Sequence, residues 1–279
     1  MRINALKLPS GLLPITRSLT LEYANSFVVA IIMVVASTVG IMYRSVIYPT
    51  EKLSIGFVSS DLLNLVVGLP VLLVSMWLTR RGKLAGLLCW PGALFYVLYI
   101  YTSYLALPVS VLLIPHIFLI ILSAYSIIGI IVSINCDAVR QRLSGVIPAK
   151  TTGGILTSIA ILVIVYQIIS IITVLINQTT PDNVELVQWI DDLVVGSPAL
   201  LVGGYLLLRR KALGYVAGAG LLLMCSVLFI GVIPAMVFQA LSADTPIDVI
   251  GILIVLISGM VCFIPFVLFV RGVAKTRIL

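Results

Sequence analysis

Charged side chains are scarce in this chain. Only 10% of its 279 residues are Asp, Glu, Lys or Arg, whereas 61% are hydrophobic, and the mean hydropathy is +1.25. A water-soluble chain of this length needs more polar residues to cover its exterior, so the composition excludes an ordinary soluble protein. A lipid bilayer removes that need, and the unit of organisation becomes a spanning helix of about 20 residues.

Motifs that carry chemistry are also missing. The sequence contains a single histidine and no C-x-x-C pair, and it has no Walker, H-E-x-x-H, G-x-S-x-G or dinucleotide-binding motif. We therefore expect no catalytic residue, no metal site and no cofactor. The cysteines are expected to be small buried apolar side chains; they are Cys89, Cys136, Cys225 and Cys262.

Long apolar runs are what the sequence does contain. Each is two to three times longer than a transmembrane β-strand of about 10 residues, and none alternates between apolar and polar residues. An all-α, polytopic transmembrane bundle is therefore the expected fold class, with the lipid bilayer as its surroundings. The runs lie near residues 24–43, 60–79, 84–105, 108–133, 153–177, 192–208, 212–238 and 247–270.

The distribution of charge predicts how these runs cross the membrane. Of the 17 basic residues, 15 lie before the first run, on every second connection or after the last run; the exceptions are Arg44 and Lys52. The positive-inside rule then places both termini in the cytoplasm and the protein in the cell membrane, as a multi-pass protein. Basic clusters between apolar runs explain the net charge of +7, so we expect no nucleic-acid partner.

An internal repeat divides the chain. A shift of 128 positions aligns residues 64–98 with 192–226 without a gap, and 14 of the 35 positions are identical. Each copy contains an even number of runs, so the copies enter the membrane in the same direction and form two parallel four-helix repeats. The expected organisation is an interfacial N-terminal segment (1–23), a first repeat (24–133), a basic cytoplasmic linker (134–152), a second repeat (153–270) and a basic cytoplasmic tail (271–279).

The repeated element [Asn/Asp]-L-V-V-G-x-Pro begins at Asn64 and at Asp192. At the start of the second and sixth runs, these side chains can cap a helix, and the neighbouring Asp61 and Asp191 would favour the positive end of the helix dipole. The alternative is a polar site on the outer face that these four residues share with His116.

A proline completes each copy of the element. Pro70 and Pro198 lie inside the second and sixth runs, at equivalent depths. Because proline has no N–H to donate, each is expected to remove a backbone hydrogen bond and to kink its helix. Such a pair of kinks makes a hinge or a vestibule, or it is fixed architecture.

Two further features accompany this element. His116 lies about eight residues into the fourth run, where an ionisable side chain is either functional or hydrogen-bonded to a neighbouring helix. Four tyrosines cluster in the third run, and they favour an aromatic belt at the headgroups, although some could line an outer cavity with Asp61 and His116. They are Tyr96, Tyr99, Tyr101 and Tyr104.

The segment from Asp61 to Tyr104 also carries a resemblance. Its pattern D-x-x-N-L-x-x-G-x-P, followed by R-R-G-x-L and spaced tyrosines, resembles a segment of uncharacterised prokaryotic multi-pass membrane proteins. The resemblance covers about a sixth of the chain. It implies a prokaryotic cell membrane and no particular activity, substrate or catalytic residue.

Three functions stay open at this point. The first is a transporter of small solutes or lipids, which the repeat and the paired prolines favour. The second is a non-catalytic membrane subunit or sensor that binds a membrane protein partner, or a second copy of itself, through its helices. The third is a membrane enzyme on the outer face that uses Asp61, His116 or Asp192 as an acid or base.

Overall fold

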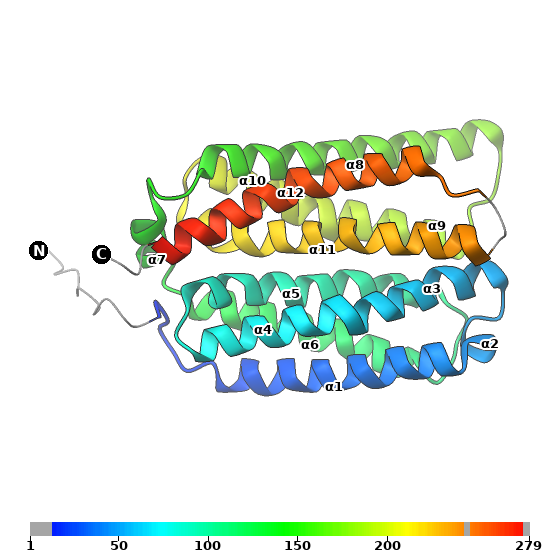
Figure 1. Cartoon of the computed structure of the whole chain (residues 1–279), viewed down its shortest axis with the longest axis horizontal. Coiled ribbons are helices and arrows are strands. Elements are labelled where there is room, and N and C mark those ends of the chain that lie inside the picture. The colour runs from blue at the N-terminus through cyan, green and yellow to red at the C-terminus, as the bar shows by residue number, and fades with distance from the viewer. Residues whose placement is uncertain (1–12, 243–245, 276–279) are drawn as a thin grey trace, which may run out of the picture.

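The computed structural model describes residues 13–242 and 246–275, and this part of the chain is a helical bundle without a β-sheet (Figure 1). Eight of its helical stretches are long and apolar enough to cross a membrane, which confirms the predicted fold class. The elements are α1 (Thr20–Met42), α2 (Arg44–Ile47), α3 (Glu51–Leu63), η1 (Asn64–Gly68), α4 (Leu69–Arg80), α5 (Leu84–Ser103), η2 (Tyr104–Ala106), α6 (Leu113–Ser133), α7 (Cys136–Leu143), α8 (Ala149–Asn177), α9 (Asn183–Ile190), η3 (Asp191–Gly196), α10 (Ser197–Leu208), α11 (Ala212–Ser242) and α12 (Val249–Lys275).

The second and sixth spans are longer than the sequence predicted. They begin at Glu51 and Asn183, nine residues before the expected starts at 60 and 192, whereas all the other span ends agree to within five residues. The helices begin there because each has an N-cap: Thr50 Oγ1 accepts a hydrogen bond from the N–H of Leu53, and Asp182 Oδ1 accepts one from Glu185. The predicted capping role of residues 64 and 192 is therefore wrong, since both lie inside helices that have already started.

A π-helical turn occupies the repeated element in both spans. The N–H of Leu69 donates to the carbonyl of Asn64, and the N–H of Ser197 donates to the carbonyl of Asp192. Each bond thus joins residues five apart, whereas the bonds of a regular α-helix join residues four apart. A wide turn of this kind inside a helix often marks a functional site.

The two prolines of the element lie directly after these wide turns. Pro70 and Pro198 are each the second residue of the α-helix that follows, α4 and α10. Both prolines lie inside the continuous spanning stretches Glu51–Arg80 and Asn183–Leu208, and each belongs to the first turn of the α-helix that follows a π-turn. The irregularity belongs to the π-turn and the proline together, and a kink at Pro70 and Pro198 stays a prediction.

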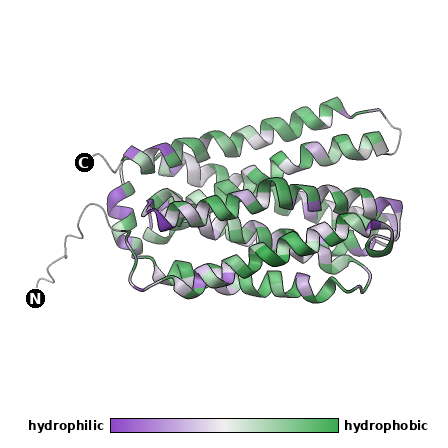
Figure 2. Ribbon diagram, turned by 60° about the horizontal axis from the view of Figure 1, so that its bottom comes forward, coloured by the Kyte–Doolittle hydropathy of each residue, from purple (hydrophilic) through white to green (hydrophobic). Residues whose placement is uncertain are grey.

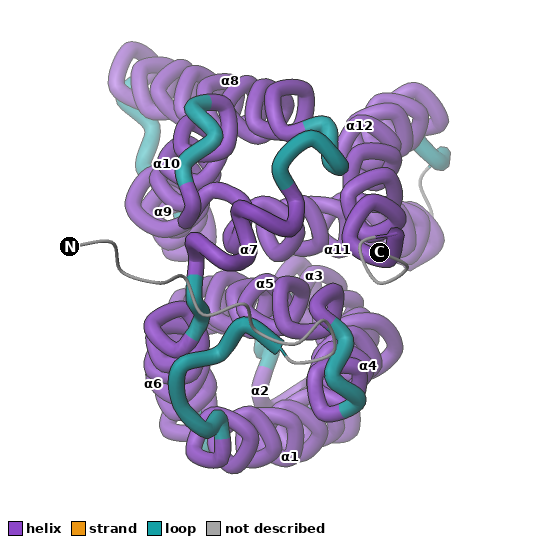
Figure 3. Tube along the Cα trace, turned by 90° about the vertical axis from the view of Figure 1, so that its left-hand side faces the viewer, coloured by secondary structure: helices purple, strands orange, loops and turns teal. Residues whose placement is uncertain are grey.

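Viewed end-on, the chain forms two groups of helices that meet along α5 and α11 (Figure 3). The two helices cross where Gly92 packs on Gly220: a methyl group on Gly92 would overlap the backbone of Gly220. Small residues at a helix crossing allow this close approach. The two glycines lie 128 positions apart, the same interval as the sequence repeat. In a twofold arrangement, a residue contacts its own counterpart only close to the axis.

The connection between α4 and α5 has the same geometry as the connection between α10 and α11, and the corresponding residues lie 128 positions apart. The N–H of Lys83 donates to the carbonyl of Leu78 at 2.9 Å, and the N–H of Lys211 donates to that of Leu206 at 2.8 Å. Such a bond closes a helix by the Schellman motif, which needs a left-handed residue just before it. That conformation is supplied in the two halves by Gly82 (φ +70°) and Arg210 (φ +52°).

Polar residues gather at the two ends of the bundle, while the sides are apolar (Figure 2). At the end that carries the termini, the described part of the N-terminal segment is bonded to the end of α6: the N–H of Thr16 donates to the carbonyl of Ser133, and the N–H of Asn135 donates to that of Pro14. The rest of the predicted interfacial segment, residues 1–12, lies outside the described residues, as does the end of the tail from residue 276.

Candidate functional site

The acidic residues of the repeated element lie further inside their helices than predicted. The second span runs from Glu51 to Arg80, so with about 1.5 Å of rise per residue Asp61 is about 7 Å from its midpoint. In the sixth span, Asn183–Leu208, Asp192 is about 5 Å from the midpoint. The expected position at the outer ends is wrong, because both helices start earlier. Ionisable residues this deep in a spanning segment point by default to function.

The first group, which we name the Asp61 cluster, is a closed network of hydrogen bonds. Tyr48 Oη donates to Asp61 Oδ2 at 2.6 Å, and Tyr104 Oη donates to Asp61 Oδ1 at 2.9 Å. Tyr96 Oη donates to Asn64 Oδ1 at 2.8 Å. These residues lie in the bend after α2, on the continuous helix α3–η1 and on α5–η2, so tertiary packing holds the cluster together. Its members are Ser37, Tyr48, Asp61, Asn64, Tyr96, Tyr101, Tyr104 and His116.

The imidazole of His116 packs against two tyrosines of this cluster. The centroid of its ring lies 4.8 Å from that of Tyr104 and 5.5 Å from that of Tyr101, and its side chain is buried. It lies in the first turn of α6, which begins at Leu113, so it is nearer the helix end than predicted. The structure thus brings His116 together with Asp61 and Asn64.

The Tyr48 phenol, which lies outside the spanning helices, is an ionisable group of this network. It lies between α2 and α3, and burial, with the adjacent Asp61 carboxylate, raises the pKa of Tyr48 above its ordinary value. The phenol therefore keeps its proton and shares it with the carboxylate in a hydrogen bond. Gly40 of α1 limits the space around this network, because any side chain at this position would overlap the Tyr48 hydroxyl and the Asp61 carboxylate.

The second group, which we name the Asp192 cluster, consists of Tyr99, Ser103, Gln167, Asp191 and Asp192. Tyr99 Oη donates to Asp192 Oδ1 at 2.5 Å, and Gln167 Nε2 donates to Asp192 Oδ2. Ser103 Oγ donates to Asp191 Oδ2 at 2.6 Å. Tyr99 and Ser103 lie one turn apart on α5, so a helix of the first half of the chain supplies hydrogen-bond donors to side chains of the second half.

Helix α5 contacts the two copies of the element in the same way. Tyr96 packs on Gly68, where an added Cβ would lie 2.7 Å from the ring, and Tyr99 packs on Gly196, where it would lie 3.1 Å from the ring. Each glycine is four residues after the polar residue that the same tyrosine binds. In each copy of the element, the spacing of four residues thus gives one tyrosine ring a glycine to pack on and gives the hydroxyl of that tyrosine a polar partner.

A cavity of about 170 Å³ adjoins the Asp192 cluster, between α5, α8, α10 and α11. Asp192 and Tyr99 line it together with Ser197, whose buried hydroxyl has no hydrogen-bond partner among the described residues. Asp192 is half-buried, whereas Asp191 and Asp61 are 0% and 1% exposed. Of these three carboxylates, Asp192 is thus the one placed on a cavity of this size.

None of these carboxylates has a basic partner within the described residues. The ion pairs found there join Arg17 to Glu22 at 2.7 Å and Lys52 to Asp182 at 2.5 Å. Among the same residues, no group of three or more His, Cys, Asp and Glu side chains is arranged to hold a metal ion. Among the described residues, the groups that contact the Asp192 side chain are thus the hydrogen-bond donors Tyr99 and Gln167.

Sequence reasoning found the acidic residues but misread their neighbours. The aromatic-belt interpretation is wrong for Tyr96, Tyr101 and Tyr104, which are 2%, 0% and 1% exposed and are buried in the bundle. No pattern in the sequence indicated Ser37 or Tyr48, because both reach Asp61 and its neighbours only through tertiary packing.

Fold and site together define a class: this is a multi-pass helical membrane protein with buried carboxylates between its helices. No family model, no curated protein and no solved structure matches the chain. The geometry of the two clusters is therefore the basis on which a function can be proposed.

Proposed function

We propose that the protein is a transporter that moves a small solute or lipid across the cell membrane, with both termini in the cytoplasm. The observation that carries this proposal is the position of Asp192. It lies about 5 Å from the midpoint of its span, lines a cavity of about 170 Å³ and has no basic partner in the described part of the chain. A carboxylate in this position is typical of a substrate or ion pathway.

Two parallel repeats suit such a function. We propose that the halves are duplicated copies related by a pseudo-twofold axis along the membrane normal, as in transporters with parallel repeats. Three features that recur after 128 residues support this proposal: the Gly92–Gly220 crossing, the left-handed turns at Gly82 and Arg210, and the π-turns.

The π-turns and their prolines supply possible hinges. Wide turns and prolines are the usual causes of a bend in a helix, and Pro70 and Pro198 follow the wide turns in equivalent spans. We propose that each half bends at this place when the transporter changes conformation. Asp192 lies in the wide turn itself, so such a bend would move the carboxylate relative to the cavity.

The enzyme hypothesis has less support from the geometry. Asp61 and His116 lie in one cluster, but both carboxylate oxygens of Asp61 accept hydrogen bonds from tyrosines, and His116 packs against two tyrosine rings. A general acid or base must reach a substrate atom. In this arrangement Asp61 and His116 contact other side chains of the protein instead, and the support that remains for an enzyme rests on Asp192 alone.

Transport by purified protein in liposomes tests the proposal. A panel of an organic cation, an amino acid, a sugar and a fluorescent phospholipid would be assayed with the wild type, with Asp192→Asn and with Asp182→Asn. The last variant is the matched control, because Asn also caps a helix and position 182 lies at the end of the bundle. We expect flux of one class, lost in Asp192→Asn and kept in Asp182→Asn.

Two results would contradict the proposal. The first is the absence of flux for every class from protein that is demonstrably folded. The second is equal flux through the wild type and Asp192→Asn. A protein that always co-purifies from native membranes with one partner, and shows no flux alone, would favour the subunit hypothesis instead.

A further inference from the structure

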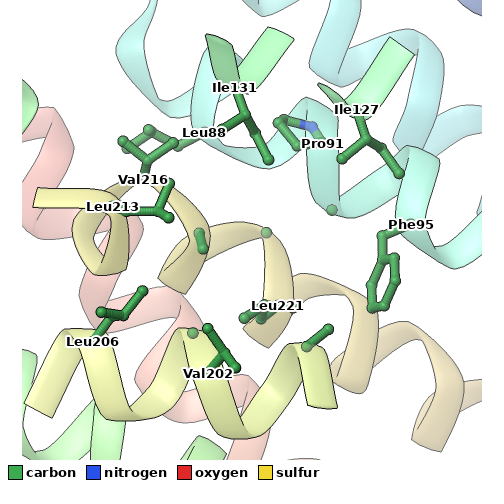
Figure 4. A pocket seen from close by; sticks show the side chains of 15 residues that line it. Leu88, Pro91, Phe95, Ile127, Ile131, Val202, Leu206, Leu213, Val216 and Leu221 are labelled. Atoms are coloured by element: carbon green, nitrogen blue, oxygen red, sulfur yellow. The ribbon is translucent and has the colours of Figure 1, made fainter. Parts of the chain in front are cut away.

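An apolar groove runs beside the Asp192 cavity, between α5, α6, α10 and α11 (Figure 4). Its volume is about 250 Å³, and the side chains along it are aliphatic or aromatic, among them Leu88, Phe95, Ile131, Val202 and Leu213. Surfaces of this kind at the depth of a membrane are in contact with lipid tails. By itself the groove therefore fits any acyl or alkyl chain.

The groove and the cavity follow one another along the same helices. On α5, Phe95 lines the groove and Tyr99, one turn further, lines the cavity. On α10, the groove includes Ala199, and the cavity includes Gly196 at the end of the preceding π-turn, which is also one turn away. Residues three or four apart lie on the same face of a helix, so an apolar chain in the groove would place its end group next to Asp192.

The cavity has the chemistry of a site for a positively charged group. Its carboxylate, Asp192, has no basic partner among the described residues, and the hydroxyl of Ser197 is buried without a hydrogen-bond partner there. Aromatic rings of Tyr99 and Phe229 are also part of its wall, and such rings attract cations over their faces. An engineered cavity of about 150 Å³ holds a benzene molecule, so a trimethylammonium or ethylammonium group fits in size.

We infer that the groove and the cavity together bind an amphiphile with a cationic headgroup: the ammonium group lies against Asp192, and the alkyl chain lies in the groove. This inference rests on the proposed transport function and names its substrate class. An anionic headgroup would be repelled by the Asp192 carboxylate, and a neutral one would leave that carboxylate without a cationic partner. The site thus selects its ligand by a positive charge on the headgroup and by an apolar chain at the other end of the molecule.

Binding of matched amphiphiles to the full chain in nanodiscs tests this inference. Radiolabelled dodecyltrimethylammonium, dodecanol and dodecanoate share one chain and differ in headgroup charge. We expect the wild type to bind the cation most tightly. Asp192→Asn should bind it about tenfold to a hundredfold more weakly, because the trimethylammonium group has no N–H to donate and is held at Asp192 by charge alone. Asp182→Asn should bind the cation as the wild type does.

A second pair of variants tests the groove. Ala217→Phe adds a ring inside the groove, and Ile169→Phe adds the same ring on α8 at a side chain that is 58% exposed. The first should weaken binding of both the cation and dodecanol by about tenfold, close to the effect of losing one or two buried methylene contacts. The second should change neither.

The outcomes separate the two proposals. If Ala217→Phe weakens binding and Asp192→Asn does not, the groove binds chains regardless of charge, and the inference fails while the lipid-transport proposal stands. If no variant changes binding, the amphiphiles only partition into the surrounding lipid, and the inference is wrong. A change of oligomeric state in Ala217→Phe would show that the groove is an interface between copies, which also overturns it. Failure of the transport proposal is measured separately, as absence of flux.

Discussion

In the first half of the chain, the element that begins at Asn64 is enclosed by tyrosines, whereas in the second half the element that begins at Asp192 borders a cavity. A shift of 128 positions shows why. The tyrosines that close the Asp61 cluster, at positions 96, 101 and 104, correspond to three residues without a hydroxyl group, and all three line the cavity: Met224, Phe229 and Val232. The positions that carry tyrosines in the first half thus carry side chains without a hydroxyl group in the second half, where they line the cavity.

We therefore propose that the element has a structural role in the first half of the chain and a binding role in the second. Asp61 has both oxygens bonded to tyrosines and stabilises the first half. Asp192 is held by Tyr99 and Gln167 but stays accessible from the cavity. We assign stability mainly to the first cluster and ligand binding mainly to the second.

The largest effect is expected where the two halves meet. Gly92→Ala should lower the free energy of unfolding by about 3 kcal/mol, because the methyl group would overlap the backbone of Gly220, which cannot move aside as a side chain can. Gly220→Ala should cost less, since its nearest atom on α5 is 2.9 Å away. Thermal unfolding in detergent measures both.

The control for that prediction is Gly56→Ala in α3. No atom lies within 4 Å of its added Cβ, so it should stabilise the helix by about 0.5–1 kcal/mol through helix propensity. Equal effects of all three substitutions would mean that the close crossing of α5 and α11 does not hold the halves together.

The second-largest effect on stability is expected for Asp61→Asn, and it distinguishes the carboxylate of Asp61 from that of Asp192. Asp61→Asn should lower the free energy of unfolding by about 2 kcal/mol, because an amide cannot accept at both atoms and one tyrosine hydroxyl loses its partner in a fully buried place. Asp192→Asn should cost less than about 1 kcal/mol, since its neighbourhood includes a cavity in which side chains can adjust. A larger loss of stability for Asp192→Asn than for Asp61→Asn would reverse the assignment of roles.

The smallest effect on stability, with a large one on binding, is expected for Met224→Tyr. This change places in the second half the tyrosine that the first half has at position 96, and the cavity of about 170 Å³ can accommodate the ring. Stability should stay within about 1 kcal/mol of the wild type, while cation binding and flux are lost. Retained binding, measured with dodecyltrimethylammonium, would show that the cavity is not the headgroup site.

The sequence was sufficient for the architecture, because spanning helices follow from long apolar runs. It predicted the eight spans, and most of their ends, from hydropathy alone. It placed the starts of the second and sixth spans too late, since Glu51, Lys52 and Asp61 make the beginning of α3 polar. Capping by Thr50 and burial of Asp61 by tyrosines, rather than hydropathy, extend that helix.

The helix geometry around the two prolines was also predicted from the sequence only in part. Their positions inside apolar runs predicted an irregular helix, and an irregular turn does precede both Pro70 and Pro198. The π-turn itself could not be predicted, because it depends on how the residues before each proline pack against α5. Gly68 and Gly196, which contact tyrosine rings of that helix, are the residues that end the wide turns.

The candidate site was predictable only in part. The repeated element drew attention to Asp61, Asn64, Asp191 and Asp192, but their depth depended on the true helix starts. The partners of these side chains depend on which faces of α1, α5 and α8 pack together, and one sequence contains no direct signal for that. The missing hydroxyl at Met224 became informative only when the repeat and the cavity were compared.

Chemical modification can compare how accessible the two clusters are to a cation. In protein whose native cysteines are replaced by alanine, Ser197→Cys and Ser37→Cys would be treated with a trimethylammonium-bearing methanethiosulfonate and with a neutral one of similar size. We predict that the cationic reagent modifies Ser197→Cys at least about tenfold faster than Ser37→Cys, because Asp192 raises the local concentration of cations. We also predict that Asp192→Asn removes this advantage for the cationic reagent only. Equal rates at the two positions, or rates at Ser197→Cys that do not depend on Asp192, would contradict the division of roles between the two clusters.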